Sequence, residues 1–438
     1  METIQQTSIT KEQREVTALL SIGTFLEYFD LMLYVHMAVL LNSLFFPKTD
    51  ALTSTLLASF AFCSTFVFRP IGALFFGWMG DKIGRKPTVI ITTFIMAIAC
   101  FTIASLPTYA QIGVTAAWII TICRIVQGIS SMGEIVGAEL YLTEMSKPPV
   151  QYPLVALIGV CGAVGSTAAL GIASLTTSFG LNWRLAFFIG GGIALVGTIA
   201  RTSLRETPEF ADAKRRVALA IENAGENSKE LLTNNNILKE KVNKKTAAAL
   251  FLLQCAWPVG FYFVYIHYGN VLKNTFHFTP EQIIHQNFIV SIVQLISFIA
   301  ITYLCYYIHP LKILIVKFYV SVVLVLISPW LLNYIDTPFY ILLLQSLHIA
   351  FWAGELPAGP VLFRHLPVFK RFTYASFTFA AARAIMYVIT SFGISYLVYE
   401  FGSFGLWIVI VPVYSVYLFG LLHFKKLEIE TGNYKKIA

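Results

Sequence analysis

Long apolar segments separated by short polar loops make up most of the chain. A transmembrane helix needs roughly 20 apolar residues, and twelve segments reach that length, in two sets of six. We place them at 17–41, 54–79, 87–106, 112–138, 153–178 and 183–203, and then at 247–270, 286–307, 311–332, 338–360, 373–398 and 404–424. The apolar runs are continuous rather than alternating, which favours helices. The pattern predicts an all-α membrane protein with twelve transmembrane helices in two pseudo-symmetric six-helix bundles.

One long polar segment separates the two sets. Its apolar positions are typical either of short amphipathic helices on the membrane surface or of a partly disordered linker. The chain therefore divides into an N-terminal bundle at 1–204, a cytoplasmic linker at 205–245, and a C-terminal bundle with a short basic tail at 246–438. The remaining loops are too short to hold a soluble catalytic domain.

A short match between the two sets indicates an internal repeat. The segment SMGEIVGAEL at 131–140 resembles WAGELPAGPV at 352–361, and both contain Gly-Glu at the same point. These segments belong to the fourth and tenth predicted spans, which a six-plus-six repeat makes equivalent. Internal repeats of this kind occur in many membrane transport folds.

The composition agrees with a polytopic membrane protein. Of the 438 residues, 57% are hydrophobic and 12% are charged, and the mean hydropathy is +0.71. Most of the 31 Lys and Arg residues fall in the tails and in loops on the same side as the N-terminus. By the positive-inside rule, both termini face the cytoplasm. The net charge of +8 follows from this bias, so we do not interpret it as nucleic-acid binding.

A few basic residues depart from that bias. Lys48 and Lys273 are expected in loops on the opposite side. The basic residues expected within or at the edges of spans are Arg69, Arg124, Arg184 and Arg383. We expect Arg69 and Arg184 to serve in packing or at helix interfaces rather than to bind substrate.

The six cysteines have no metal-binding or redox signature. All fall in predicted spans, and none has CxxC or metal-ligand spacing. We therefore expect them to pack as small apolar side chains. The chain also lacks GxSxG and HExxH motifs, so neither a metal site nor an enzyme is expected.

The segment GALFFGWMGDKIGRK, from Gly72 to Lys86, is the most specific motif. It reads G-x4-G-x3-D-K-x-G-R-K and lies between the second and third spans. Its first two glycines allow helices to approach closely, and Gly84 permits a tight turn. Asp81 can accept hydrogen bonds from helix N-terminal amides or from a basic side chain, and so latch the two halves together. The predicted gating residues are Gly72, Gly77, Asp81, Gly84, Arg85 and Lys86.

The first span contains two carboxylates in the otherwise apolar run FLEYFDLML, residues 25–33. Glu27 and Asp30 share one helical face. A carboxylate at mid-membrane costs about 2.5–3.5 kcal/mol, and it is tolerated when paired, protonated or hydrated. Arg124 of the fourth span lies at a similar depth to Asp30. We therefore predict an Asp30–Arg124 pair, with Glu27 and Glu134 nearer the cytoplasm.

This arrangement suits proton coupling. Asp30 stays ionised beside Arg124 and takes up a proton when the arginine is drawn away. Protonation then changes which conformation is favoured. The alternative is a static structural salt bridge, but the acids outnumber Arg124 in this half. The predicted proton-coupling residues are Glu27, Asp30, Arg124 and Glu134.

The second half provides most of the other candidate contacts. Arg383 in the eleventh span either pairs with Glu355 of the tenth span or binds a substrate carboxylate. The seventh span is rich in aromatic residues, which serve either as a cage for a quaternary ammonium group or as packing. Pro258 is expected to break that span near the cavity. The predicted substrate-binding residues are Tyr34, Gln127, Gln254, Trp257, Tyr265, Glu355, Arg383 and Tyr387.

Several of these segments together resemble a known family. The motif at 72–86 resembles the signature loop of the major facilitator superfamily. The segments FLEYFDLMLY, RPIGALFFGWMGDKIGRK, CRIVQGISSMGEIVGAELYLTE, NWRLAFFIGG and LRETPEF narrow this to a resemblance to its metabolite:proton symporter family. The resemblance is dense in the first half and holds in outline in the second. The second-half counterpart of the motif, Tyr303–Lys317, lacks the glycines and the aspartate.

The resemblance implies proton-driven import of a small polar metabolite across a bacterial inner membrane. It also implies alternating access, with the proton gradient in place of a cofactor. Members of the family carry proline and betaine, 2-oxoglutarate, shikimate, citrate and similar metabolites. The acid surplus and the aromatic seventh span favour a zwitterionic osmolyte such as proline or glycine betaine. A carboxylate bound by Arg383 and Arg124 is the alternative.

A non-transporting membrane sensor is a third hypothesis, because the second half lacks the latch motif. A sensor binds the metabolite without moving it, so a flux measurement separates the two classes. The expected partners are the small-molecule metabolite, protons and the lipid bilayer, and we expect a monomer.

Overall fold

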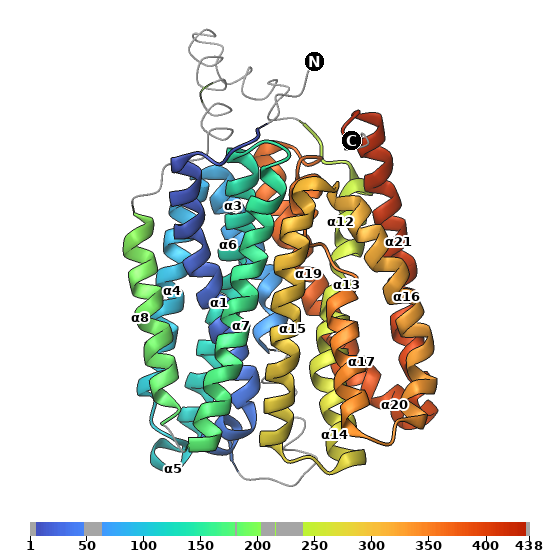
Figure 1. Ribbon diagram of the computed structural model, residues 1–438. Coiled ribbons are helices and arrows are strands. Elements are labelled where there is room, and N and C mark those ends of the chain that lie inside the picture. The colour runs from blue at the N-terminus through green and yellow to red at the C-terminus, as the bar shows by residue number, and fades with distance from the viewer. Residues whose placement is uncertain (1–5, 48–63, 180–181, 203–214, 216–239, 435–438) are drawn as a thin grey trace.

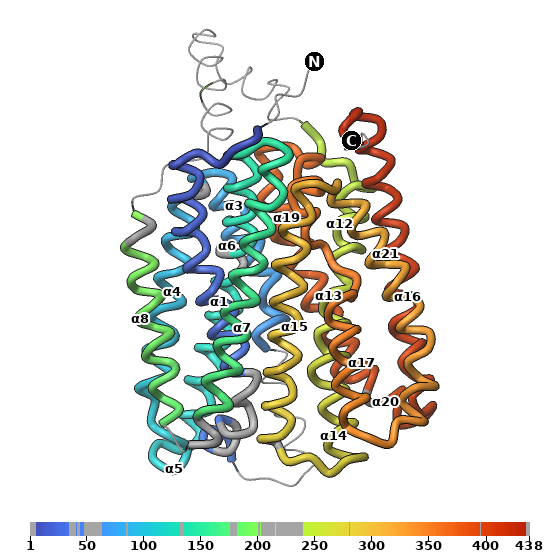
Figure 2. Tube along the Cα trace, viewed as in Figure 1, coloured from blue at the N-terminus to red at the C-terminus, as the bar shows by residue number. Residues whose placement is uncertain are grey.

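The helices of the protein run side by side in a single array (Figures 1 and 2). The computed structural model describes residues 6–47, 64–179, 182–202, 215 and 240–434. Helices from the first half of the chain occupy one side of the array, and helices from the second half occupy the other. The predicted linker at 205–245 lies almost entirely outside the described residues, so its boundaries stay a prediction.

The first half contains the long helices expected from its apolar segments. Of its second span, 54–63 lie outside the described residues. The described helices of this N-terminal bundle are α1 (Lys11–Phe45), α3 (Arg69–Lys82), α4 (Arg85–Ser105), α5 (Tyr109–Ile112), α6 (Val114–Met145), α7 (Gln151–Phe179) and α8 (Arg184–Arg201).

The second half has more interruptions than the first. Two spans contain a π-helical turn, at Tyr262–His267 and at Ile389–Ile394. The described α-helices of this C-terminal bundle are α12 (Lys244–Gln254), α13 (Ala256–Phe261), α14 (Tyr268–Phe276), α15 (Pro280–Tyr307), α16 (Pro310–Tyr334), α17 (Pro338–Phe351), α18 (Gly359–Phe363), α19 (Val368–Val388), α20 (Ser395–Phe401) and α21 (Gly405–Glu430).

Local sequence sets several helix ends. Proline is the first residue of α15, α16 and α17, where a missing N–H leaves no helical hydrogen bond unmade. The Thr279 hydroxyl accepts a hydrogen bond from the Gln282 backbone N–H at the start of α15, and the Gln282 side chain completes a capping box. Gly402 adopts a φ of 56° between α20 and α21, a backbone conformation that favours glycine.

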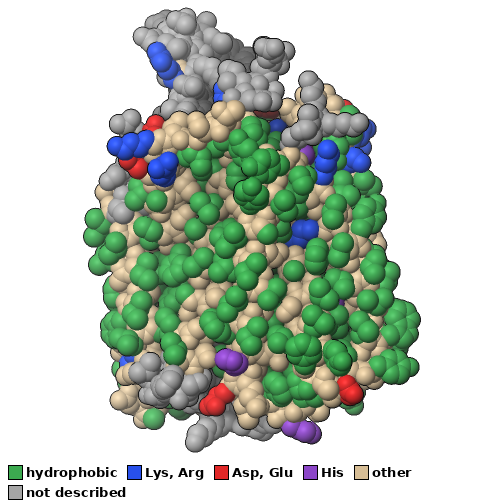
Figure 3. Space-filling model, viewed as in Figure 1, with side chains coloured by type: hydrophobic (Ala, Val, Ile, Leu, Met, Phe, Trp, Pro, Cys, Tyr) green, Lys and Arg blue, Asp and Glu red, His purple; other side chains and the backbone are tan. Residues whose placement is uncertain are grey.

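The described helices fit a membrane-spanning array. By length and hydropathy, eight stretches of the described residues qualify as membrane-spanning helices, and α8 and α17 contain shorter apolar helices. One of the eight, Val368–Glu430, includes two crossings separated by the turn at Gly402. Hydrophobic side chains cover much of the face in Figure 3, and most charged side chains gather near its two ends. The architecture of two six-helix bundles predicted from the sequence therefore holds.

The start of α1 and the end of α21 lie at the same end of the array (Figure 1). Most of the Lys and Arg side chains visible in Figure 3 also lie near this end. We refer to it below as the basic end.

The tenth span is not the continuous helix predicted over 338–360, so that prediction is wrong in part. Helix α17 ends at Phe351, and residues 352–358 are non-helical before α18 begins. Gly354 and Pro357 lie within this segment. Glycine has a low helix propensity, and proline lacks the N–H that a helix interior requires.

Neighbouring helices hold the non-helical segment in place. Tyr417 of α21 donates a hydrogen bond to the Gly354 carbonyl at 2.9 Å. The Trp352 indole N–H donates to the Ala256 carbonyl at 2.8 Å. Polar backbone groups inside a membrane protein need such internal partners because lipid offers none. Hydrogen bonds from the neighbouring helices therefore stabilise the break within the C-terminal bundle.

The seventh span is interrupted near Pro258, as expected. Helix α12 ends at Gln254 and α13 begins at Ala256. Pro258 has no N–H to donate to the carbonyl four residues earlier, which belongs to Gln254, so the helix loses a hydrogen bond at this point. The interruption places the start of α13 beside the space between the bundles.

Candidate substrate pathway between the two bundles

Two adjacent cavities lie among the described residues of the two bundles. The cavity that includes Glu139, here the Glu139 cavity, holds about 830 Å³ including its open part. The cavity that includes Glu27, here the Glu27 cavity, holds about 540 Å³ on the same basis. Both are lined by helices of both bundles. The side chains that the two cavities share are Tyr28, Ser166, Trp257, Gln294 and Arg383.

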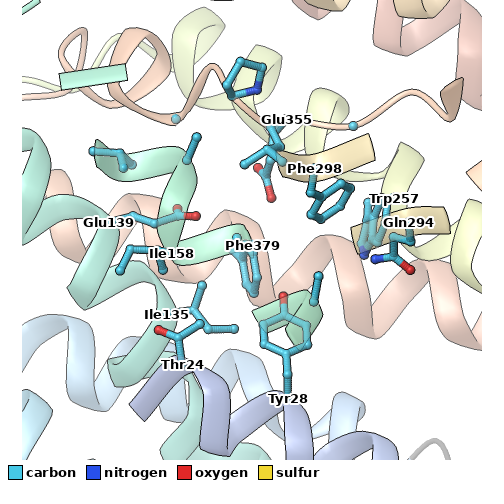
Figure 4. A pocket seen from close by; sticks show the side chains of 18 of the residues that line it. Thr24, Tyr28, Ile135, Glu139, Ile158, Trp257, Gln294, Phe298, Glu355 and Phe379 are labelled. Atoms are coloured by element: carbon cyan, nitrogen blue, oxygen red, sulfur yellow. The ribbon is translucent and has the colours of Figure 1, made fainter. Parts of the chain in front are cut away.

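Two carboxylates face the Glu139 cavity from opposite bundles. Glu139 extends from α6 and Glu355 from the non-helical segment after α17, and both point into the same space in Figure 4. Arg383 of α19 places Nη2 3.7 Å from Glu355 Oε1. Its guanidinium carbon also lies 3.2 Å from the centre of the Phe379 ring. Arg383 thus pairs with Glu355 and still lines the cavity, so both interpretations of this arginine remain open.

Aromatic side chains of the C-terminal bundle form part of the wall of the Glu27 cavity. Trp257 and Tyr265, two of the predicted substrate-binding residues, both line it. The Tyr265 hydroxyl donates a hydrogen bond to Gln294 Oε1 at 2.6 Å, which fixes its ring. Tyr387 of α19 lines the same cavity and lies 4.2 Å, centre to centre, from the ring of Phe66 in the other bundle. Several aromatic faces are therefore available to a cation. Some of the other aromatic residues of the seventh span line neither cavity.

Arg69 lies at the interface between the bundles and also lines a cavity there. It is buried and lines the Glu27 cavity, where it interacts electrostatically with Glu27 and stacks on Phe66 at 4.7 Å. This position agrees with the expected interface role, and the expectation that Arg69 does not bind substrate stays a prediction. Arg184 fits its predicted role, since Nη1 donates 2.8 Å hydrogen bonds to two carbonyls at the end of α4.

The ion pair expected between Asp30 and Arg124 is present inside the N-terminal bundle. Arg124 Nη1 lies 3.7 Å from Asp30 Oδ2, and each side chain is only 3% exposed. The Cys100 thiol donates to Asp30 Oδ1 at 3.4 Å. Neither charged residue lines the Glu27 or the Glu139 cavity. The pair is thus separated from the space that a substrate can enter.

Tyr34 and Gln127, two predicted substrate ligands, belong to this buried cluster. Arg124 donates a 2.9 Å hydrogen bond to Gln127 Oε1, and its guanidinium lies 4.0 Å from the centre of the Tyr34 ring. Neither residue lines the two cavities. In this structure they orient Arg124 rather than reach a substrate.

Two other predicted site residues, Gln254 and Glu134, are not among the described residues that line the cavities. Gln254 is buried at the end of α12 and interacts with Glu355. Glu134 lies in α6, but its side chain is outside the described residues. Its predicted role in proton coupling therefore stays a prediction.

The glycine motif lies where α3 meets α6 and α19 at the basic end. A Cβ on Gly72 would overlap the Ile129 carbonyl oxygen of α6, and a Cβ on Gly77 would come within 2.8 Å of Thr373 Cα in α19. Asp81 Oδ2 accepts hydrogen bonds from the Thr373 backbone N–H at 2.9 Å and from its hydroxyl at 2.6 Å. The motif therefore brings the two bundles into direct contact.

The remaining motif residues form the turn into α4. Gly84 has a φ of 130°, which favours glycine and permits the tight turn. Lys86 is half-buried in the first turn of α4. Arg85 begins that helix, and its side chain is outside the described residues.

Further polar contacts join the bundles at the basic end. Arg371 of α19 places Nη1 3.3 Å from Glu144 of α6, and both side chains are buried. Arg364 donates a hydrogen bond to the Tyr152 hydroxyl of α7 at 3.1 Å. Its Nε also lies 3.6 Å from the buried Glu428 of α21. The pathway is thus flanked at this end by contacts that must rearrange if the bundles separate.

Residues 20–367 match the family model described as Major Facilitator Superfamily, which is more than half of the chain. The chain belongs to the major facilitator superfamily. The twelve spans, the two bundles and the glycine motif at their interface agree with this membership.

Several proteins of the superfamily are similar in sequence over part of the chain. A proline/betaine transporter of Salmonella typhimurium is 33% identical over 207 residues, which cover 46% of this chain and 41% of that protein. An inner membrane metabolite transport protein of Escherichia coli is 34% identical over 228 residues, 50% of this chain and 52% of that protein. The chain spans about half of the length of these curated relatives.

Solved structures of the superfamily share the fold over nearly the whole chain. The proton:xylose symporter XylE superposes with a TM-score of 0.76 at 16% identity, covering 94% of this chain and 95% of that one. The human organic anion transporter MFSD10 superposes with a TM-score of 0.66 at 14% identity, covering 94% and 99%. At these identities the likeness shows the fold alone.

Two charged residues that line the Glu139 cavity are not among the site residues predicted from the sequence. Glu139 falls just beyond the predicted end of the fourth span at 138, whereas α6 continues to Met145. A signal was present, because Glu139 follows Ser131 at twice the four-residue spacing of one helix face. Lys317 is the second: it falls inside the predicted span 311–332 but is not among the basic residues expected within spans. It is buried in α16 and lines the Glu139 cavity, rather than lying in a loop.

Proposed function

We propose that this protein is a proton-coupled symporter that imports a small polar metabolite by alternating access across a bacterial inner membrane. The favoured substrate is a zwitterionic osmolyte such as proline or glycine betaine. The observation that carries the proposal is the separation of two acid–arginine pairs. Asp30–Arg124 is enclosed in one bundle, whereas Glu355–Arg383 lines a cavity between the bundles. A proton carrier and a substrate contact thus occupy different places.

The relatives support both the proposed substrate and the proposed coupling to protons. The Salmonella protein is a proline/betaine transporter, and a second relative from Dickeya dadantii carries glycine betaine, proline, ectoine and pipecolic acid by its name. XylE, which shares the fold, is a proton symporter. A zwitterion and a proton are therefore the natural first pair of ligands to test.

Helix α1 connects the two events. Tyr28 faces both cavities, and Asp30 follows two residues later on the opposite, enclosed side of the same helix. A substrate that shifts α1 therefore also changes the position of Asp30 relative to Arg124. When the arginine moves away, the buried carboxylate becomes stable only with a proton. Protonation and substrate binding then favour the same conformation, which is the thermodynamic basis of symport.

Alternating access requires the contact at the basic end to open and close. Thr373 and Asp81 join α19 to α3 there, and both termini are proposed to face the cytoplasm at this end. Breaking this contact opens the pathway toward the cytoplasm, and reforming it closes that side. We propose that the protein transports as a monomer, because the candidate pathway lies between two bundles of one chain.

The test is the external pH of a lightly buffered suspension of proteoliposomes. Proline, glycine betaine, 2-oxoglutarate, citrate and shikimate are added one at a time, with protein-free vesicles as the control. Alkalinisation with proline or glycine betaine, absent from the control vesicles, is the expected result. If correctly folded protein gives no change in external pH with any of the five solutes, proton symport of this class is contradicted.

Symport of a carboxylate is the second candidate, and one observation favours it. Two cationic side chains, Arg383 and Lys317, line the Glu139 cavity. Arginine and lysine both bind carboxylates. Alkalinisation with 2-oxoglutarate, citrate or shikimate, and not with the zwitterions, selects this candidate.

A further inference from the structure

The Glu139 cavity contains two charged side chains that lack ionic partners. Lys317 is 6% exposed and lines the cavity from α16. Glu139 lines it from α6 and points into it (Figure 4). Within the described part of the chain, neither side chain forms an ion pair or a side-chain hydrogen bond. Burying the unpaired charge of Lys317 is costly, so this group needs a ligand, and the half-buried Glu139 carboxylate faces the same cavity.

The other two charges of the cavity already satisfy each other. Arg383 and Glu355 lie 3.7 Å apart and both belong to the C-terminal bundle. What remains is one acid from the N-terminal bundle and one cation from the C-terminal bundle. The unsatisfied charges therefore have opposite signs and come from opposite sides of the interface.

A small zwitterion complements this arrangement better than an ion of one sign. Its carboxylate can pair with Lys317 while its cationic nitrogen pairs with Glu139. Apolar side chains such as Phe298, Phe379 and Ile135 line the space with them, and these suit the methyl or ring carbons of a compact zwitterion. A dicarboxylate, by contrast, would bring negative charge toward Glu139 and Glu355.

We propose that Glu139 and Lys317 are the two charge anchors of a zwitterionic substrate, one anchor from each bundle. The proposal rests on the proposed transport function, and it adds the residues that select the substrate class. Because the ligand joins the two bundles, its binding also favours the arrangement in which they lie close together.

The test uses three solutes of nearly the same shape. Glycine betaine has both charges, choline keeps the quaternary nitrogen without the carboxylate, and 3,3-dimethylbutyrate keeps the carboxylate without the charged nitrogen. Binding of each is measured by calorimetry on purified full-length protein in lipid nanodiscs. Proline serves as a second zwitterion. The wild-type protein should bind the zwitterions at least about tenfold more tightly than either single-charge analogue.

The variants Glu139→Gln and Lys317→Met should give opposite patterns. Glu139→Gln should lower betaine affinity about tenfold and leave dimethylbutyrate unchanged or tighter. Lys317→Met should lower betaine affinity by a similar factor and leave choline unchanged. Lys312→Met on the same helix and Glu281→Gln in α15, neither of which lines the cavity, are the matched controls. Thermal unfolding of every variant checks that it is folded.

Three results overturn the proposal. The first is wild-type protein that binds neither zwitterion, or that binds dimethylbutyrate as tightly as betaine. The second is an equal loss for all three solutes in both variants, which indicates a structural role. The third is unchanged binding in both variants. Calorimetry without a proton gradient does not require coupling, so the crossed pattern can hold even if the proteoliposome test for symport fails.

Discussion

The two acid–arginine pairs have the same spacing and different surroundings. The nitrogen–oxygen distance is 3.7 Å in both. Asp30 and Arg124 are each 3% exposed and lie inside one bundle, whereas Glu355 is 20% exposed and lines a cavity. Charge interactions are stronger where water is excluded. The surroundings therefore distinguish a proposed internal switch from a proposed substrate contact, although the chemical groups are alike.

The same contrast applies to the two motif glycines of α3. Gly72 meets the backbone of α6 within its own bundle, and Gly77 meets α19 of the other bundle. A contact within a bundle persists through an alternating-access cycle, whereas a contact between bundles must break. The predictions below separate these two kinds of contact, beginning with the largest expected effect.

Asp30→Asn should abolish proton movement and leave substrate exchange. Asparagine keeps the shape of the side chain and can still accept a hydrogen bond from Arg124, but it cannot take up a proton in the physiological range. Alkalinisation of the proteoliposome suspension should fall to the level of protein-free vesicles, while counterflow of labelled substrate continues. Glu355→Gln is the comparison variant, and it should retain coupling with weaker substrate binding. Normal alkalinisation by the Asp30→Asn protein would exclude Asp30 as the proton carrier.

Arg124→Met should destabilise the protein by about 3–5 kcal/mol, because it leaves a buried carboxylate without its partner. Arg383→Met should cost less, since Glu355 reaches the cavity. Thermal unfolding in detergent measures both. The double variant Asp30→Asn/Arg124→Met should recover part of the loss, because the uncompensated charge is gone. Equal losses for Arg124→Met and Arg383→Met would show that exposure does not distinguish the pairs.

Gly72→Ala and Gly77→Ala should have different consequences. Gly72→Ala forces apart helices of one bundle and should cost about 1–3 kcal/mol of stability, measured by thermal unfolding. Gly77→Ala pushes α3 away from α19 and should mainly favour the form opened at the basic end. Hydrogen exchange of the Thr373 amide, which donates to Asp81, reports that opening.

Gly192→Ala is the matched control for both glycines, because a Cβ there meets nothing within 4 Å. It should leave Thr373 exchange unchanged and should not destabilise the protein, because alanine favours a helix more than glycine does. If Gly77→Ala destabilises as Gly72→Ala does and leaves Thr373 exchange unchanged, the distinction between the two contacts is lost.

Lys426→Ala should have the smallest effect, below about 0.5 kcal/mol. Lys426 and Glu430 lie 3.8 Å apart with side chains 76% and 55% exposed, so water screens them. The same thermal assay gives the value. A loss close to that of Arg124→Met would mean that burial does not set the strength of ion pairs in this protein.

Hydropathy and helical spacing are sufficient for much of the fold and for part of the site. The apolar segments predict the helices, and equal depth in two spans predicts the Asp30–Arg124 pair, because both depend on distance along a helix. The Arg383–Glu355 pair follows from the scarcity of charge in spans. These inferences need no knowledge of how the bundles pack.

Features that depend on packing between helices are not accessible in the same way. Thr373 as the partner of Asp81 depends on the docking of α19 against α3. Hydropathy ends the fourth span one residue before Glu139. Lys317 falls inside the predicted span 311–332, but nothing in the sequence indicates that it faces a cavity. Both positions beside the cavity depend on how the helices pack. The position of Tyr34 and Gln127 against Arg124, away from the cavities, likewise follows from how α1 packs against α6.

The break after α17 also bears on how the protein is made. A helix of 14 residues is about 21 Å long, shorter than the hydrocarbon core of about 30 Å. Non-helical residues must therefore complete the crossing, and their polar backbone is held in part by Tyr417 of α21. Because α21 follows this segment in the chain, the wall that contains Glu355 takes its final form only after α21 has entered the membrane. The Glu139 cavity, which Glu355 lines, is therefore complete only once α21 is in place.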